Sequence, residues 1–163
     1  MIGMYRVREI RDGDKEAVAG IIAERWGSPI IVSRGKRHDV LSLPGFIAEM
    51  DNKIVGLATY CIDDGECELT SLDSLLENRG IGTSLVDAVV DAARAASCRR
   101  VWLITTNDNT KAIRYYQKRG FLFAAVHLGA IERARVLKPE IPQYGIDGIP
   151  ILHEIEFEKV LVK

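Results

Sequence analysis

The stretch that decides the fold is LLENRGIGTSLVDAVVDAA, residues 75–93. Apolar residues recur in its second half at helical spacing, which predicts an amphipathic helix. Two glycines, Gly80 and Gly82, stand where a strand-like run gives way to that helix. A helix start carries unpaired N–H groups and the positive end of the helix dipole, and glycines let a phosphate approach them closely. The stretch therefore predicts a phosphate site, although a tight connection between two elements would use the same glycines.

The predicted phosphate site combines several converging backbone amides with the hydroxyl of Thr83 and the charge of Arg79. It fits two common nucleotide motifs poorly. No Gly-Lys-Ser/Thr run follows for a P-loop, and neither a third glycine nor a ribose-binding acid stands at Rossmann spacing. The residues expected to hold the phosphates are Asn78, Arg79, Gly80, Ile81, Gly82 and Thr83.

A second constellation lies in the segment NDNTKAIRYYQKRGF, residues 107–121. It predicts a helix that begins near Asn109 and ends at Gly120. Tyr116 lies inside this helix, on the same face as Ala112. Taken alone, such a tyrosine is usually a core aromatic with its hydroxyl at the rim.

Together, the two segments resemble the GNAT superfamily of acyl-CoA-dependent N-acetyltransferases. The family's pyrophosphate motif, Gln/Arg-x-x-Gly-x-Gly/Ala, corresponds to ENRGIG at residues 77–82, with Glu77 where the family usually has Gln or Arg. Its later motif, Asn-x-x-Ala-x-x-x-Tyr-x-x-x-Gly-Phe, is matched throughout at residues 109–121. The resemblance implies that acetyl-CoA is the co-substrate and that a primary amine, on a small molecule or a protein, attacks its thioester directly in a ternary complex.

The resemblance also implies how the cofactor arm is held. In the family, the fourth strand hydrogen-bonds the pantetheine arm as if the arm were another strand. Tyr116 matches the family tyrosine that lies near the thioester sulfur and can protonate the leaving thiolate. The backbone N–H of Leu72 is expected to polarise the thioester carbonyl. The other expected cofactor contacts come from Asp73, Ser74 and Asn109.

A base must also remove a proton from the amine, because a protonated amine is not nucleophilic. Glu66 and Glu68 share one face of the strand that enters the site. We expect Glu68 to act, directly or through water, since it is nearer the expected thioester; the alternative is a solvated strand residue. Cys67 faces the other way, which argues against an acetyl-cysteine intermediate.

The acceptor is expected beside the first helix and the loop that follows it, opposite the cofactor, as in the family. That loop carries a basic cluster at residues 34–37, which could bind an acceptor carboxylate or phosphate or could simply be solvated. The long loop at residues 137–152 could fold over the site. The candidate substrate-binding residues are Trp26, Arg34, His38 and Tyr144.

The order of elements predicts a single domain over residues 1–163, with an α/β (α+β) fold. The resemblance implies a mixed, mostly antiparallel sheet of about seven strands, with helices on both faces and with the fourth and fifth strands splayed apart. Strands are expected at residues 4–10, 45–62 (a hairpin), 66–75, 99–105, 121–131 and 153–162, and helices at 12–27, 80–94 and 108–120. Irregular loops are expected at 28–45, where a short helix is the alternative, and at 133–152.

Composition excludes several other classes of protein. The net charge of −1 gives no general attraction to nucleic acid or to anionic membranes. No signal peptide or membrane-length apolar run is present, so a cytoplasmic protein is expected, and a homodimer is possible. The histidines and the three cysteines lack metal-ligand spacing, so no metal is expected. The alternative function is a CoA-binding sensor or partner module without turnover.

Overall fold

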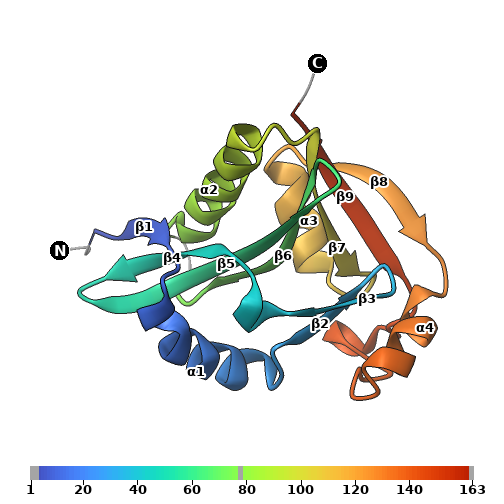
Figure 1. Cartoon of the computed structure of the whole chain (residues 1–163). Helices are drawn as coiled ribbons and strands as arrows, with labels where there is room; N and C mark the ends of the chain where they lie inside the picture. Colours follow the sequence, from blue (N-terminus) through green and yellow to red (C-terminus); the bar gives the residue numbers. More distant parts are fainter. Residues whose placement is uncertain (1–3, 77–78, 162–163) are drawn as a thin grey trace.

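A central sheet of seven strands organises the computed structural model, which describes residues 4–76 and 79–161 (Figure 1). The strand order is β1-β4-β5-β6-β7-β9-β8, and every neighbouring pair is antiparallel except β6 and β7. The predicted mixed, mostly antiparallel sheet is therefore confirmed. The strands are β1 Arg6–Glu9, β4 Gly45–Met50, β5 Lys53–Asp63, β6 Glu66–Ser74, β7 Arg100–Thr106, β8 Leu122–His127 and β9 Glu154–Val160.

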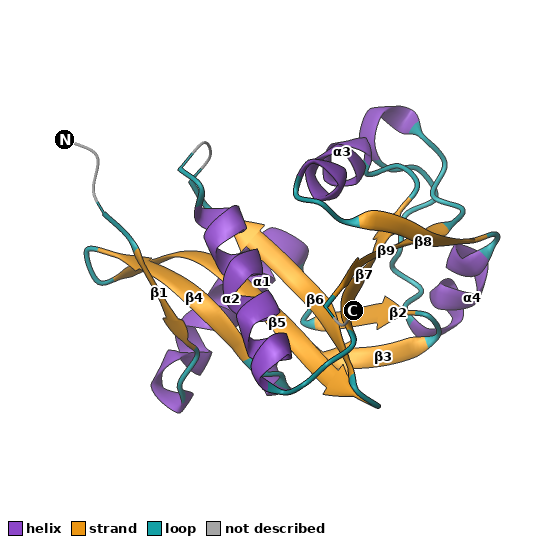
Figure 2. Cartoon of the chain, turned by 90° about the horizontal axis from the view of Figure 1, so that it is seen from above, coloured by secondary structure: helices purple, strands orange, loops and turns teal. Residues whose placement is uncertain are grey.

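Helices cover both faces of the sheet, as predicted (Figure 2). Helix α1 (Lys15–Trp26) packs on one face, where Val18 and Ile22 meet side chains of β4 and β5. Helices α2 (Ile81–Ala95) and α3 (Thr110–Lys118) cover the other face. The buried stripe of α2 has the expected helical spacing and consists of Ile81, Leu85, Val86, Val89, Val90 and Ala93.

A second, two-stranded sheet lies where an irregular loop was predicted. Strands β2 (Ile30–Ser33) and β3 (Lys36–Asp39) form a hairpin on the same side of the main sheet as α1 (Figure 1). Its two turn residues, Arg34 and Gly35, have φ of 50° and 73°, as tight hairpins require. The prediction was wrong because β3 is almost entirely charged and lacks an apolar pattern. A short 3-10 turn, Val40–Ser42, follows the hairpin.

The region after β8 also differs from the prediction. The chain forms helix α4 (Ala130–Leu137) where the sequence predicted the end of a strand and the start of a loop. Gly129 precedes the helix with φ of 70°, and Ile131 and Ala134 form its buried face. The Pro- and Gly-rich composition downstream obscured this short helix. Of the predicted loop, residues 138–152 do lack regular helix or strand apart from a 3-10 turn at Ile146–Gly148.

Strands β6 and β7 correspond to the predicted fourth and fifth strands of the fold, and they part almost at once. Their parallel pairing covers only Cys67 with Val101 and Glu68 with Trp102. A register shift opposite Thr59 places a bulge at this point of β6. The hydroxyl of Thr59 bonds those of both Thr70 and Ser71, and all three are buried, so polar contacts stabilise the bulge. The predicted splay is confirmed. No helix among the described residues could cross a membrane.

Candidate active site

The parting of β6 and β7 leaves backbone groups of β6 without a strand partner on one side. The amide of Leu75 donates to the carbonyl of Val55 on β5 across 2.8 Å. Because backbone groups alternate in direction along a strand, those of Leu72 and Ser74 point toward the gap and those of Asp73 toward β5. The two residues at the open edge can therefore hydrogen-bond an extended arm. The carboxylate of Asp73 instead lies 3.4 Å from Nε of Arg25 on α1.

The predicted phosphate site lies at the start of α2, beside this gap. Gly80 is the N-cap of the helix and has φ of 73°, a conformation that favours glycine. A Cβ on Gly82 would lie 3.0 Å from the Tyr115 hydroxyl, so the tyrosine would have to shift to admit a larger residue. The first-turn amides of Ile81, Gly82 and Thr83 have no helical acceptor and can face an anion. Glu77 and Asn78 lie outside the described residues, and Arg79 is exposed.

Residues missed in the sequence surround this helix start. Nε of Arg119 donates to Oγ1 of Thr83 across 2.8 Å, and its guanidinium lies 4.7 Å from the ring centre of Tyr115. On the other side, the hydroxyls of Tyr5 and Ser84 are 2.7 Å apart. The predicted hydroxyl of Thr83 is thus already engaged, and Arg119 brings a second positive charge to the site. The sequence signal that could have identified Arg119 is its position at the end of α3, shortly after Tyr115 and Tyr116.

Helix α3 carries two predicted site residues, Asn109 at its start and Tyr116 on its buried face. Asn109 is the N-cap, and its side-chain oxygen accepts from the amide of Ala112 across 3.1 Å. Tyr116 is buried, with its ring centre 5.6 Å from that of Phe121 and 6.3 Å from that of Phe157. Burial raises the pKa of Tyr116, with a smaller effect from Tyr115. The phenol therefore keeps its proton, and within the described residues it makes no hydrogen bond.

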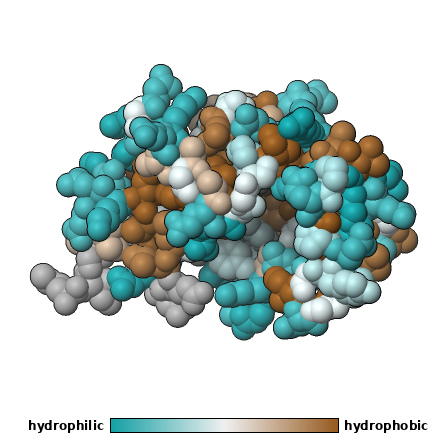
Figure 3. Space-filling view, turned by 90° about the horizontal axis from the view of Figure 1, so that it is seen from below, coloured by the Kyte–Doolittle hydropathy of each residue, from teal (hydrophilic) through white to brown (hydrophobic). Residues whose placement is uncertain are grey.

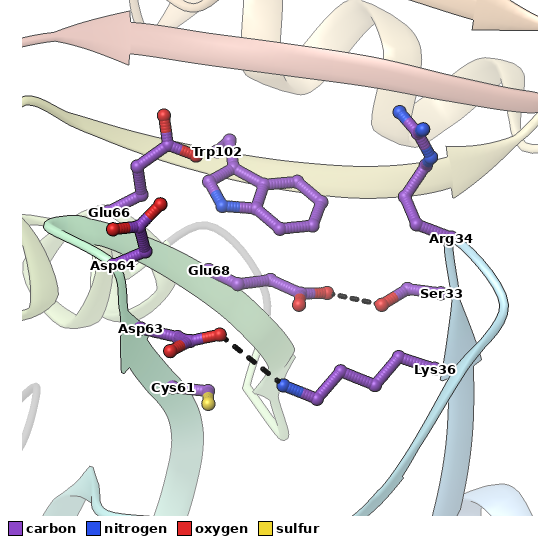
Figure 4. A pocket seen from close by; sticks show the side chains of 9 residues that line it. All are labelled: Ser33, Arg34, Lys36, Cys61, Asp63, Asp64, Glu66, Glu68 and Trp102. Carbon is purple, nitrogen blue, oxygen red and sulfur yellow. Dashed lines mark hydrogen bonds and ion pairs between the residues drawn. The ribbon is translucent and has the colours of Figure 1, made fainter.

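Glu68 lies at the last paired position before β6 and β7 part, on the face that carries the hairpin (Figure 4). The residue is only 6% exposed, and the hydroxyl of Ser33 donates to its Oε2 across 2.5 Å. Burial raises the pKa of Glu68 to about 7, against the lowering effects of Ser33 and Lys36. A carboxyl group with a pKa near neutrality is well suited to accept and release protons.

His38 lies behind Glu68, on strand β3. Its Nε2 is 3.3 Å from Oε1 of Glu68, but the angles are not those of a hydrogen bond. Burial, with a smaller effect from Lys36, lowers the pKa of His38, so the imidazole is neutral at neutral pH. His38 lines neither cavity at the site. The structure thus places this predicted acceptor residue next to the candidate base.

Two cavities meet at Glu68 and Ser33, which line both. The charged cavity, of about 300 Å³, opens toward the turn between β5 and β6; the apolar cavity, of about 190 Å³, lies along the gap between β6 and β7. Figure 3 views this side of the molecule, whose surface is hollowed near its middle. The charged cavity is lined by Ser33, Arg34, Lys36, Cys61, Asp63, Asp64, Glu66, Glu68 and Trp102.

Carboxylates of β9 lie beside the charged cavity, and basic side chains form ion pairs with them. Nη1 of Arg100 donates to Glu156 across 2.8 Å and to Glu158 across 2.9 Å. Arg34 donates from Nη1 to Glu156 across 3.0 Å. Burial works against ionisation of Glu156, but the hydrogen bonds from Arg100 and His127 outweigh it and lower its pKa. Arg34 therefore anchors the hairpin to the sheet as well as lining the charged cavity.

The other predicted acceptor residues are not brought to Glu68. Trp26 lies at the end of α1 and packs against the core beneath that helix. Tyr144 is 66% exposed on the loop after α4, where it bridges to Pro150 and lines neither cavity. Ser33 was predicted only as a member of the acceptor loop, without a role, and Glu154 was not predicted. The hairpin places Ser33 on Glu68, and β9 places Glu154 in the lining of the apolar cavity. Their positions depend on long-range pairing and carry no local pattern.

The model of one known family matches residues 4–121, a span that contains the gap, the start of α2 and helix α3. The chain belongs to the acetyltransferase (GNAT) family. This GNAT chain is 47% identical to YdhI of Bacillus subtilis (strain 168) over 148 residues, which cover 90% of the chain and 92% of YdhI. It is 40% identical to YxbD of the same organism, with 90% and 93% covered.

Solved structures show the same GNAT fold. An IAA acetyltransferase from Bacillus cereus ATCC 14579 superposes with a TM-score of 0.75 at 17% identity, covering 97% of this chain and all of that one. A Bacillus subtilis acetyltransferase solved in complex with CoA gives 0.70 at 15% identity, covering 98% and 100%. At these identities the likeness concerns the fold.

Proposed function

We propose that this GNAT chain transfers an acetyl group from acetyl-CoA to a primary amine by direct attack in a ternary complex. The observation that carries the proposal is Glu68, a buried carboxyl group with a pKa of about 7 at the point where β6 and β7 part. Family membership and the CoA bound to a structural relative support acetyl-CoA as the co-substrate.

The proposed seat for acetyl-CoA follows from the open backbone groups. The open edge of β6 at Leu72 and Ser74 would hydrogen-bond the pantetheine arm, and the Leu72 N–H would polarise the thioester carbonyl. The first-turn amides of α2 and the charge of Arg119 would hold the pyrophosphate. Asn109, at the start of α3, would reach the arm from the opposite side. The open edge of β6 and the first-turn amides of α2 are backbone groups without a partner in a strand or helix, which supports this seat.

Glu68 would act as the base on the hairpin face of the sheet. In its ionised form it would take one proton from the ammonium group of the acceptor, directly or through one water. The freed nitrogen would then attack the thioester carbon, so a C–N bond forms as the C–S bond breaks. Ser33 would hold the carboxyl group in place through its hydrogen bond, and the neutral His38 beside it would add no positive charge.

Tyr116 would act as the acid on the other face. Its pKa is raised by burial, so the phenol is protonated and can donate to the leaving thiolate. The nitrogen loses its second proton as the amide forms, and this proton restores the phenol through solvent. The products are the N-acetylated amine, CoA in its thiol form and one proton released from Glu68.

Direct attack is favoured over an acetyl-cysteine intermediate. Cys67 is fully buried in the core on the α2 side, and burial raises the pKa of its thiol to about 12. Its thiolate is therefore scarce at neutral pH, and its side chain points away from Glu68 and the acceptor face.

The experiment that tests the proposal measures CoA release from acetyl-CoA with a panel of primary amines, alongside calorimetric binding of acetyl-CoA. Amine-dependent release that fails in a Glu68→Gln variant supports the enzyme. Tight binding of acetyl-CoA without release by any amine would instead show the alternative function, a CoA-binding module without turnover.

A further inference from the structure

The apolar cavity described above differs from the charged one in the origin of its walls. Its apolar side chains come from β2, from β7, from α4 and from the loop after it, whereas its ionisable groups are few. The lining consists of Ile31, Val32, Ser33, Glu68, Leu69, Thr70, Ile104, Thr105, Thr106, Ile131, Ala134, Lys138, Ile141, Ile151 and Glu154.

This cavity adjoins the place where transfer would occur. Leu69 and Thr70 of β6 come directly after the last paired residue of that strand, and Ile104 of β7 comes two residues after its own; all three line the cavity. Glu68 stands at its edge with a carboxyl oxygen bonded to Ser33. A thioester held along β6 would therefore border the cavity, and so would a nitrogen that gives its proton to Glu68.

The size and chemistry of the cavity select a compact apolar group. Its volume is about 190 Å³, and an apolar cavity of about 150 Å³ is known to hold a benzene molecule. Ile131, Ala134 and Ile151 are each less than 10% exposed and form its deeper wall. Transfer of an apolar group from water to apolar walls is favourable, whereas a polar group would lose its hydrogen bonds with water there.

The ionisable groups around the cavity favour an amine over an acid. Glu154 is 3% exposed and lies in the wall, where its Oε1 accepts from the amide of Arg34 across 3.2 Å. Burial raises the pKa of Glu154, as it does that of Glu68. Lys138 is the cation in the lining, and its Nζ already donates to the carbonyl of Ile30 across 2.8 Å. An acceptor carboxylate would thus face two carboxyl groups and an engaged lysine.

We propose that the acceptor is a primary amine carried on one apolar group of about the size of an aromatic ring, without a carboxylate, and that this group fills the apolar cavity. The inference rests on the proposed function and names the acceptor class for it. The amine nitrogen lies at Glu68, and the apolar group extends toward α4, with Glu154 excluding acidic analogues.

The test measures binding of three probes to the protein in complex with CoA, and their acetylation with acetyl-CoA. Phenethylamine carries the ring, ethylamine lacks it, and phenylalanine adds a carboxylate. We expect phenethylamine to bind at least about tenfold more tightly than ethylamine, as one or more apolar groups in a pocket provide. It should also bind at least about tenfold more tightly than phenylalanine, because burying the added carboxylate beside two carboxyl groups costs desolvation free energy.

Two variants and one matched control locate the site. Ala134→Leu fills the cavity from α4, so it should weaken phenethylamine by about tenfold and leave ethylamine nearly unchanged. Val136→Leu is the matched control, because Val136 lies on the same helix and is 80% exposed. Glu154→Gln should narrow the preference for phenethylamine over phenylalanine.

The outcomes separate this inference from the proposed function. If amines are acetylated but the ring and Ala134→Leu have no effect, the acceptor class is wrong and the acetyltransferase stands. If hexanoyl-CoA reacts faster than acetyl-CoA with ethylamine, the cavity holds a longer acyl group in place of the ring. That result would also overturn the proposed acceptor class. If phenethylamine binds as expected but is never acetylated, the site stands and the proposed function fails.

Discussion

Glu68 and Tyr116 lie on opposite faces of the central sheet, on either side of the gap between β6 and β7. Cys67 and Leu69 pack in the same core as Tyr116, and Glu68 stands between them on the strand, so its side chain points to the other face. The proposed base and acid are thus separated by the backbone of the sheet. A proton would be taken on one face and another delivered on the other, without competition between the two groups.

The first prediction concerns Glu68 as the base. Glu68→Gln keeps the shape of the side chain but cannot accept the proton, so we expect kcat to fall by about 10²–10⁴-fold. The pH profile of kcat/KM for the wild type should rise through about pH 7, where Glu68 ionises, and that break should vanish in the variant. Glu66→Gln is the control, because Glu66 shares the strand but pairs with Arg100. A wild-type break that persists in Glu68→Gln would assign it to another group.

The second prediction concerns Tyr116 as the acid. Tyr116→Phe removes a hydroxyl that makes no hydrogen bond within the described residues, so the aromatic core should be kept. We expect turnover to fall by about 10²-fold while acetyl-CoA affinity changes little. Stopped-flow turnover and calorimetry check the two quantities. Tyr115→Phe is the contrast, since its hydroxyl lies by Thr83 and should affect binding instead. Equal turnover in Tyr116→Phe and wild type would leave the residue a packing role.

The third prediction concerns the start of α2. Gly82→Asp places a Cβ against Tyr115 and a carboxylate where the pyrophosphate is expected. CoA affinity should fall by at least about tenfold, because both space and charge oppose the anion. Calorimetry with CoA measures it. Gly20→Asp, on the exposed side of α1 with open space around it, is the matched control. Unchanged affinity in Gly82→Asp would exclude this helix start as the phosphate site.

The fourth prediction concerns stability and pH. The pKa of Glu68 rises from 4.5 to about 7 on folding, so the folded state holds this proton more tightly than the unfolded state. Its contribution to stability is present below about pH 4.5 and is lost as pH rises through about 7, by up to about 3 kcal/mol. Urea denaturation at pH 5 and pH 8 measures the free energy of unfolding, and this free energy should fall less between the two pH values in Glu68→Gln than in the wild type. An equal loss in both proteins would contradict the raised pKa.

Local patterns in the sequence were enough for the parts of the site that lie on one element. The helical spacing after Gly80 predicted α2, and the motif around Asn109 and Tyr116 predicted the cap and buried face of α3. Strand alternation also placed Glu68 and Cys67 on opposite faces. In each case the relevant geometry is set within one turn or a few strand residues, which periodicity records directly.

The remaining parts depend on contacts between distant segments. Ser33 reaches Glu68 only because a charged strand pairs with Ile30–Ser33, and neither strand predicts the other. Arg119 meets Thr83 across 36 positions of sequence. Helix α4 is short and precedes Pro139, so its composition resembled that of a loop. Packing, rather than propensity, decides these placements.

The two-residue pairing of β6 with β7 has a mechanical consequence. It divides the sheet into two panels, β1-β4-β5-β6 and β7-β9-β8, that share a seam of only two rungs. An extended molecule that hydrogen-bonds along the open edge of β6 would act as a removable eighth strand. It would fill the gap between the two panels and stabilise their contact. The protein should therefore unfold more cooperatively and at higher temperature when that strand is in place, because only the folded chain can bind it.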